Sequence, residues 1–96
     1  MSPPVKTLCV SVTGRVQGVS FRAWTMREAE ALGLAGWVRN ERDGSVTALI
    51  SGPAEDVAQM LARLHHGPRF ARVTSVTAEE TAPPKGAGFE IAATSR

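Results

Sequence analysis

Apolar and polar residues alternate in several short stretches of the chain, whereas two longer stretches repeat apolar residues every three or four positions. Alternation is typical of a half-buried strand, and the longer repeat is typical of one face of a helix. The two patterns predict strands at residues 6–13, 36–41, 45–51, 73–79 and 89–93, and helices at residues 23–32 and 53–66.

Some of these elements are better defined by the pattern than others. Val57, Met60, Leu61 and Leu64 form the clearest helical face, and Phe21, Thr25, Ala29 and Leu32 form a second one. Gly33 is placed to end the first helix in a left-handed conformation. Asp43-Gly44 predicts the tip of a hairpin. The strand at 73–79 has an uncertain phase, because Val73 and Val76 do not alternate.

This order of elements predicts an α+β fold, a ferredoxin-like split βαβ sandwich with one added C-terminal strand. Two helices are expected on one face of an antiparallel sheet. Right-handed crossovers place the first and third strands in the middle, so the first and second strands run in the same direction. The carboxyl ends of these two strands therefore lie at the same end of the sheet, where we expect Arg22 and Asn40 to meet. Residues 1–96 are expected to form a single domain, since a chain of 96 residues buries one modest core.

A glycine-containing loop joins the first predicted strand to the first predicted helix, with the sequence GRVQGVSFR at residues 14–22. A loop that leads from a strand into a helix start binds anions through backbone N–H groups, and the helix dipole adds positive potential. Gly14 and Gly18 permit backbone angles or a close ligand approach that a side chain would forbid. Arg22 adds a planar guanidinium suited to two phosphate oxygens. The loop therefore predicts a phosphate site.

Composition and charge indicate the class of protein that carries this site and where in the cell it is expected. A hydrophobic fraction of 43% and a charged fraction of 21% are ordinary for a globular domain, and a net charge of +2 is too small to predict a nucleic-acid partner. Most basic residues are arginines scattered along the chain, and this bias is typical of a high-GC bacterial source. Cys9 is the only cysteine, and no stretch resembles a signal peptide or a membrane helix. We expect a cytoplasmic protein without a membrane partner.

The loop carries donors for a phosphate and no acid, base or nucleophile of the usual kinds. Ser20 has no His and carboxylate pair to activate it, so we expect a small structural residue there. The glycine spacing is not that of a Walker A motif. No paired carboxylates predict a metal site, and His65 and His66 point to different faces of a helix end. We expect neither metal nor cofactor.

The sequence resembles the acylphosphatase family at two separate motifs. The first is GRVQGVSFR at 14–22, and the second is GWVRN at 36–40 followed by Gly44, Val46 and Gly52. The resemblance runs from about residue 8 to residue 91. It implies catalytic roles for Arg22 and Asn40, without metal or cofactor. One departure is Glu41, since relatives often have threonine there, and on a strand its side chain should face away from Asn40.

The combined hypothesis is hydrolysis of an acyl phosphate to a carboxylate and inorganic phosphate. The leaving group is already a stable anion, so no general acid is needed. Arg22 and the backbone N–H groups of the loop would hold the phosphoryl oxygens, and Asn40 would orient the attacking water. The loop residues are Arg15, Val16, Gln17, Gly18, Val19 and Ser20. Gln17 either contacts the ligand or braces the loop. No acyl specificity is predicted, and broad use of small acyl phosphates is expected.

Three alternatives remain at this point. The first is a non-catalytic anion-binding or regulatory domain on the same fold. The second, an RNA-binding module, is disfavoured because the strands at 8–13 and 45–51 contain no aromatic residue. The third is the acylphosphatase-like segment of a larger maturation enzyme, although a free-standing enzyme is the simpler expectation. A monomer is the default for a domain of this size.

Overall fold

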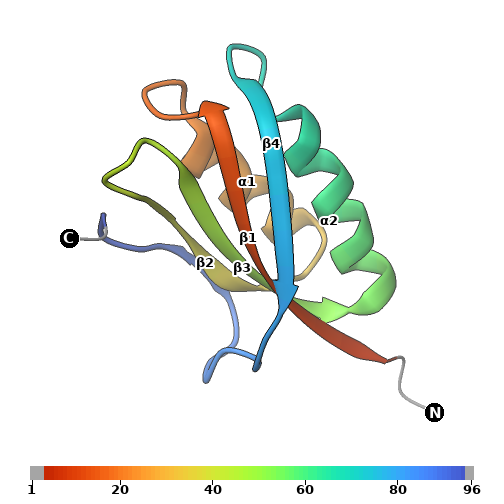
Figure 1. The fold of residues 1–96 in the computed structure, drawn as a ribbon. Helices are drawn as coiled ribbons and strands as arrows, with labels where there is room; N and C mark the ends of the chain where they lie inside the picture. Colours follow the sequence, from red (N-terminus) through yellow and green to blue (C-terminus); the bar gives the residue numbers. More distant parts are fainter. Residues whose placement is uncertain (1–3, 95–96) are drawn as a thin grey trace.

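Five strands and two helices follow one another in the predicted order in a computed structural model, which describes residues 4–94 (Figure 1). The element boundaries differ from the predicted ones by a few residues. The elements are β1 (Val5–Arg15), α1 (Phe21–Ala31), β2 (Ala35–Asn40), β3 (Val46–Pro53), α2 (Ala54–His66), β4 (Arg72–Glu80) and β5 (Phe89–Ile91).

The strands form one sheet in the order β4-β1-β3-β2-β5, which confirms that the first and third strands lie in the middle. The first four strands are antiparallel to their neighbours, as predicted, whereas β5 pairs with β2 in parallel and makes the sheet mixed. The reason is the loop at 81–88, which crosses from the β4 edge to the opposite edge before β5 begins (Figure 1). The α+β fold itself is confirmed.

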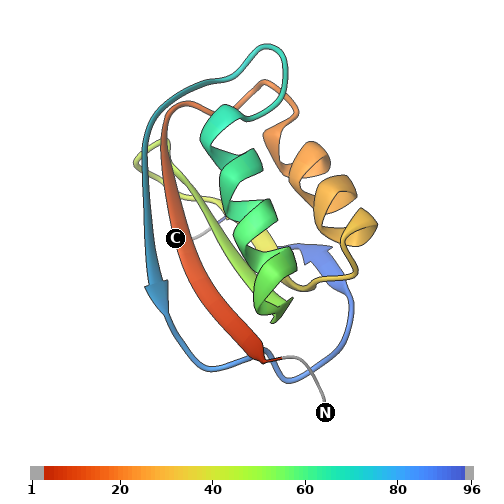
Figure 2. The ribbon, with the colours of Figure 1, turned by 90° about the vertical axis from the view of Figure 1, so that its right-hand side faces the viewer.

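Both helices pack on the same face of the sheet, which Figure 2 shows from the side. Helix α1 covers β2 and β5, and α2 covers β1, β3 and β4. The predicted helical faces are the buried ones: Phe21, Thr25 and Ala29 in α1, and Val57, Met60 and Leu64 in α2. They meet Val10, Val12, Val38 and Ile50 from the strands. This core fixes the start of α1 over the end of β2.

A β-bulge at the end of β1 explains the uncertain phase of the fourth strand. Thr13 is paired with Ser75 and Gly14 with Val73, so Thr74 is the extra residue on β4. Val73 and Val76 can therefore both pack against the core, although they are three residues apart. Gly14 has φ 124°, and a Cβ atom there would collide with the carbonyl oxygen of Arg72. Glycine at this position therefore allows β1 to lie close to β4 at the point where the phosphate loop begins.

The predicted hairpin joins β2 to β3 at residues 41–45. The Glu41 N–H donates to the Ser45 carbonyl oxygen at 2.9 Å, and Gly44 has φ 95°. Asp43 Oδ1 accepts hydrogen bonds from the hydroxyl and the N–H of Ser45, at 2.6 and 2.9 Å. These two bonds, the hydroxyl one first, hold the pKa of Asp43 below its ordinary value. The turn is therefore well defined, and it fixes the residues that follow Asn40.

Candidate active site

The loop between β1 and α1 is held by one buried side chain and two left-handed residues. Val16 is buried in the core, and Gly18 and Ser20 have φ 73° and 62°. Ser20 is the only non-glycine residue with positive φ within 4–94. Its carbonyl oxygen accepts the first helical bond, from Trp24 N–H at 3.0 Å, and its hydroxyl caps nothing. The N–H groups of the first helical turn therefore remain available to a ligand.

The two helix starts differ in charge. The first turn of α2 contains Glu55 and Asp56, which neutralise the positive end of its dipole. The first turn of α1 contains no acidic residue, and it carries Arg22. Among the hydrogen bonds and ion pairs within 4–94, none involves the Arg22 guanidinium. The positive potential at the N-terminus of α1 is therefore not neutralised by an acidic residue, unlike that of α2.

A pocket of about 400 Å³ brings Arg22 and Asn40 together, as predicted, although they lie far apart in the sequence. We call it the Asn40 pocket. Among the residues that the structure describes, no carboxylate lines it. Its lining residues are Val16, Gln17, Gly18, Ser20, Phe21, Arg22, Ala23, Asn40 and Ile91. The loop and the helix start thus supply cationic and N–H donor groups, and β2 supplies an amide.

Asn40 is the last residue of β2, and its side-chain oxygen has no partner. The Oδ1 atom is buried and accepts no hydrogen bond; within 4–94, the only other such side-chain atom is Thr25 Oγ1. A buried acceptor without a partner is unfavourable unless a water or ligand satisfies it. Asn40 lines the pocket, and its oxygen keeps the capacity to accept a hydrogen bond from a water or ligand that reaches it.

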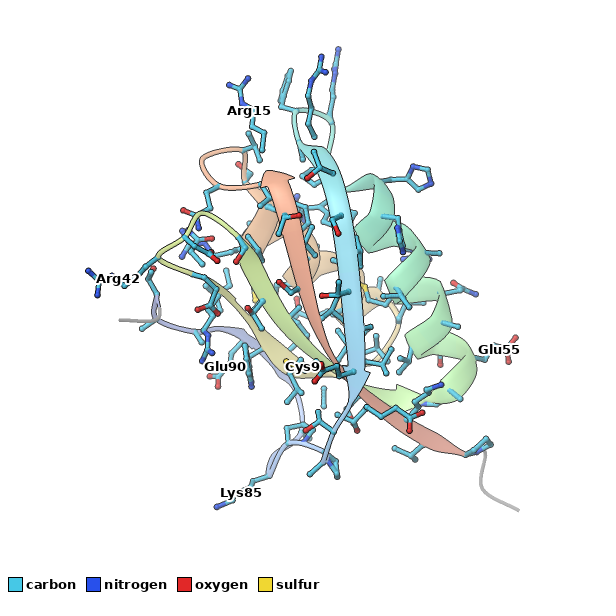
Figure 3. The ribbon with its side chains drawn as sticks, viewed as in Figure 1. Cys9, Arg15, Arg42, Glu55, Lys85 and Glu90 are labelled. Atoms are coloured by element: carbon cyan, nitrogen blue, oxygen red, sulfur yellow. The ribbon has the colours of Figure 1, made fainter. Side chains whose placement is uncertain are left out.

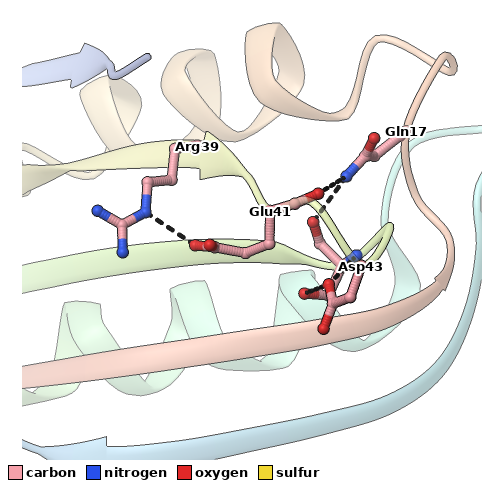
Figure 4. Close-up of polar contacts among 5 residues, drawn as sticks. Gln17, Arg39, Glu41 and Asp43 are labelled. Atoms are coloured by element: carbon pink, nitrogen blue, oxygen red, sulfur yellow. Dashed lines mark hydrogen bonds and ion pairs between the residues drawn. The ribbon is translucent and has the colours of Figure 1, made fainter. Parts of the chain in front are cut away.

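The structure favours one of the two interpretations of Gln17. Its Nε2 atom donates to the carbonyl oxygens of Glu41 and Ser45, at 2.8 and 2.9 Å (Figure 4). Both hydrogens of this amide are therefore committed to backbone. Gln17 braces the phosphate loop against the hairpin that follows Asn40, so one side chain holds the two halves of the site in register.

Glu41 does not line the Asn40 pocket. Its Oε2 atom accepts a hydrogen bond from Arg39 Nε at 2.8 Å (Figure 4). The Arg39 guanidinium also lies 4.6 Å from the centre of the Trp37 ring. Arg39 is adjacent to Asn40 on β2, so the two side chains emerge on opposite faces of the sheet. The acidic residue next to Asn40 is thus engaged away from the anion site.

Two of the predicted loop residues line a neighbouring hollow instead. Arg15, Gly18, Val19, Ser20 and Phe70 enclose about 370 Å³, and we call this the Phe70 hollow. Gly18 and Ser20 line both the hollow and the Asn40 pocket. Figure 3 shows the Arg15 side chain projecting outward beyond the end of β1. Phe70 was not anticipated, because a single apolar residue in a Gly-Pro segment carries no pattern.

The remaining candidate features lie elsewhere. Another pocket, of about 520 Å³, is lined by Trp37, Leu49, Phe89 and the loop at 84–88, and by no predicted site residue. His65 and His66 are exposed in the last turn of α2. Within 4–94, no three His, Cys, Asp or Glu residues lie close enough to form a metal site. No helix in this range is long and apolar enough to cross a membrane.

Together, the fold and the pocket define a ferredoxin-like α+β protein with a candidate anion site at a strand–loop–helix junction. Comparison with known proteins identifies the family. The acylphosphatase family model matches residues 8–91. The acylphosphatase of Rhizobium meliloti is 53% identical over 92 residues, which cover 95% of this chain and 97% of that protein. The acylphosphatase of Nitrobacter hamburgensis is 64% identical over 67 residues, 70% of this chain and 68% of the other.

A solved structure agrees with these relatives. The acylphosphatase structure from Coxiella burnetii superposes with a TM-score of 0.88 at 33% identity, covering 92% of this chain and 93% of that one. The chain belongs to the acylphosphatase family. Its activity is the hydrolysis of acyl phosphates to a carboxylate and inorganic phosphate. Nothing in the comparisons supports a non-catalytic anion-binding domain.

Proposed function

We propose that the Asn40 pocket carries out this hydrolysis, with Arg22 and the loop as the phosphate clamp and Asn40 as the residue that orients water. The observation that carries the proposal is that Asn40, whose Oδ1 atom is buried and has no partner, lines the same pocket as Arg22. An acceptor in this position takes one hydrogen of the attacking water and points a lone pair of that water at phosphorus. Positioning of this kind is a large part of catalysis in phosphoryl transfer.

The bond changes require little from the protein. The water oxygen bonds to phosphorus while the bond between phosphorus and the acyl oxygen breaks, and its electron pair leaves with the carboxylate. A phosphoryl oxygen accepts the proton of the water. The N–H groups of residues 15–20 and the Arg22 guanidinium stabilise the charge on the phosphoryl oxygens. The uncompensated start of α1 supports this assignment, since its first turn has no acid of its own.

The test is hydrolysis of benzoyl phosphate by the wild type, Arg22→Ala and Asn40→Ala, with folding checked by circular dichroism. Each substitution is expected to lower kcat/KM by about 100- to 1000-fold, because each removes one preorganised group. Arg27→Ala is the matched control, since it removes an exposed arginine from the same helix outside the pocket. Full activity in a folded Asn40→Ala protein would contradict the proposed role of Asn40.

The proposal includes catalysis without metal or cofactor. Activity should persist after dialysis against a chelator, because the phosphate charge is met by protein groups alone. Loss of turnover on chelation, with recovery on adding a divalent cation, would overturn this part of the proposal.

The proposed setting is a cytoplasmic monomer that binds neither nucleic acid nor membrane. The single cysteine, Cys9, supports a reducing compartment. Size-exclusion chromatography with light scattering tests the monomer, and fractionation of cells that express the protein tests the location.

A further inference from the structure

Exposed apolar side chains gather around the active site. Within 4–94, three large hydrophobic residues are exposed: Val5 at 70%, Phe70 at 72% and Ile91 at 41%. Val5 is at the far end of β1, whereas Ile91 lines the Asn40 pocket and Phe70 lines the adjoining hollow. Single exposed apolar residues need no explanation. Two that line the Asn40 pocket and the hollow next to it are candidates for contacts with the substrate.

The turn that carries Phe70 is anchored at both ends, so the exposed ring has a defined place. Gly67, with φ 70°, lies closely against the Phe21 ring, and the Ala71 N–H donates to the Pro68 carbonyl oxygen at 3.0 Å. Ala71 itself packs against the core. The Arg69 guanidinium lies 5.5 Å from the centre of the Phe70 ring. The segment is therefore held in place while its largest apolar side chain remains outside the core.

The Phe70 hollow adjoins the Asn40 pocket, because Gly18 and Ser20 line both. Figures 1 and 2 both show the turn at 67–71 beside the loop at 16–20, at the same end of the molecule. Gly18 has no side chain to form a barrier, and even a Cβ atom there would meet nothing within 4 Å. A substrate whose phosphate lies in the Asn40 pocket can therefore extend over Gly18 into the hollow.

In-line displacement decides between Ile91 and Phe70. The leaving group departs on the side of phosphorus opposite to the attacking water. With the water at Asn40, the acyl group must point away from β2 and from its neighbour β5. Ile91 is paired with Val38 and therefore lies on the Asn40 side. Gly18, Ser20 and the hollow beyond them lie on the loop side.

We propose that the Phe70 hollow is the acyl-group subsite of this enzyme and that Phe70 gives a preference for aromatic acyl phosphates over acetyl phosphate. The inference rests on the proposed roles of Arg22 and Asn40. Val19 and the open face of the Phe70 ring provide the apolar contact. Arg15 provides positive potential where the departing carboxylate acquires its charge. Phe70 is thus a specificity-determining residue.

The experiment measures kcat/KM for benzoyl phosphate and acetyl phosphate in the wild type, Phe70→Ala, Phe70→Tyr and Ile91→Ala. The benzoyl-to-acetyl ratio should fall about two- to tenfold in Phe70→Ala, which is the usual size of an aromatic contact. Phe70→Tyr keeps the ring and should keep the ratio. Val5→Ala is the matched control, because it removes an equally exposed side chain away from the site.

Two results would overturn the inference. One is an unchanged ratio in folded Phe70→Ala, and the other is a ratio that falls in Ile91→Ala but not in Phe70→Ala. If one of these results is found while Arg22→Ala and Asn40→Ala have lost activity, only the proposed acyl subsite is wrong and the proposed catalytic roles still hold. Full activity in those two variants would instead mean that the proposed catalytic roles have failed.

Discussion

At the scale of single residues, two side-chain amides of the site have opposite hydrogen-bonding states. Gln17 donates both of its amide hydrogens to backbone carbonyl groups, whereas the Asn40 oxygen accepts nothing. The NH2 group of Gln17 therefore has no hydrogen left for a ligand, whereas the Asn40 oxygen can still accept one. The sequence shows the same functional group at both positions, so their roles become separable only when their partners are known.

Substitutions at Gln17 should separate bracing from catalysis. Gln17→Ala removes one hydrogen bond from each of two part-buried carbonyl groups, which keep only their backbone donors, and should lower the free energy of unfolding by about 1–3 kcal/mol. Gln17→Glu should be worse at neutral pH, since a carboxylate would face two carbonyl oxygens. Urea unfolding measures both. Gln59→Ala, at an exposed position on α2, is the control and should change stability by less than about 0.5 kcal/mol. Equal stability of all three variants would contradict the bracing role.

At the scale of elements, the decisive features are the places where regular structure is interrupted. β4 has a bulge at Thr74, opposite the end of β1. The loop then passes through left-handed Gly18 and Ser20, and α1 begins without an acidic residue. The order of elements and the buried helix faces could be predicted from the periodicity. The bulge could not, because it arises from the way two distant strands are paired. It appeared in the sequence only as the irregular spacing of Val73 and Val76.

Two glycines at strand contacts should be far less replaceable than one in a loop. A Cβ atom at Gly14 would collide with the backbone of β4, and one at Gly36 would collide with the Leu49 carbonyl group. Both have positive φ, at 124° and 141°. Gly14→Ala and Gly36→Ala should each destabilise the protein by about 3 kcal/mol or more.

Gly86→Ala is the matched control for these two substitutions. It lies in the loop at 81–88, and a Cβ atom there would meet nothing within 4 Å. Its effect in thermal or urea unfolding should be small. A stable Gly14→Ala protein would mean that the bulge is not required for the fold.

At the scale of the whole molecule, the site depends on the direction of the strands. β1 and β2 both run antiparallel to β3, so the loop after β1 and the last residue of β2 lie at the same end of the sheet. Helix α1 then lies over β2 with its positive end at that edge. If the proposed phosphate clamp is correct, its groups are in place before any substrate arrives, and the product phosphate should stabilise the folded state.

Inorganic phosphate is expected to raise the melting temperature of the wild type. At a hundredfold excess over Kd, binding to the folded state alone contributes about 2.7 kcal/mol. In a domain of this size, each 1 kcal/mol corresponds to a shift of roughly 4–8 °C. Arg22→Ala should lose most of this shift, and Arg27→Ala should retain it. Differential scanning fluorimetry across a phosphate series, at constant ionic strength, provides the measurement. An equal shift in Arg22→Ala would exclude Arg22 as a phosphate ligand.

The sequence by itself determined the fold class, the place of the loop at 14–22 between a strand and a helix, and the location of Arg22 and Asn40 at one site. These follow from local periodicity, from two motifs and from the handedness of crossover connections, all of which act over short stretches of chain. Only the tertiary structure decided that Gln17 braces the hairpin, that Glu41 pairs with Arg39, that β5 runs parallel to β2 and that Phe70 borders the site. Each of these depends on which distant backbone or side chain comes within a few ångströms, and no local pattern encodes such distances.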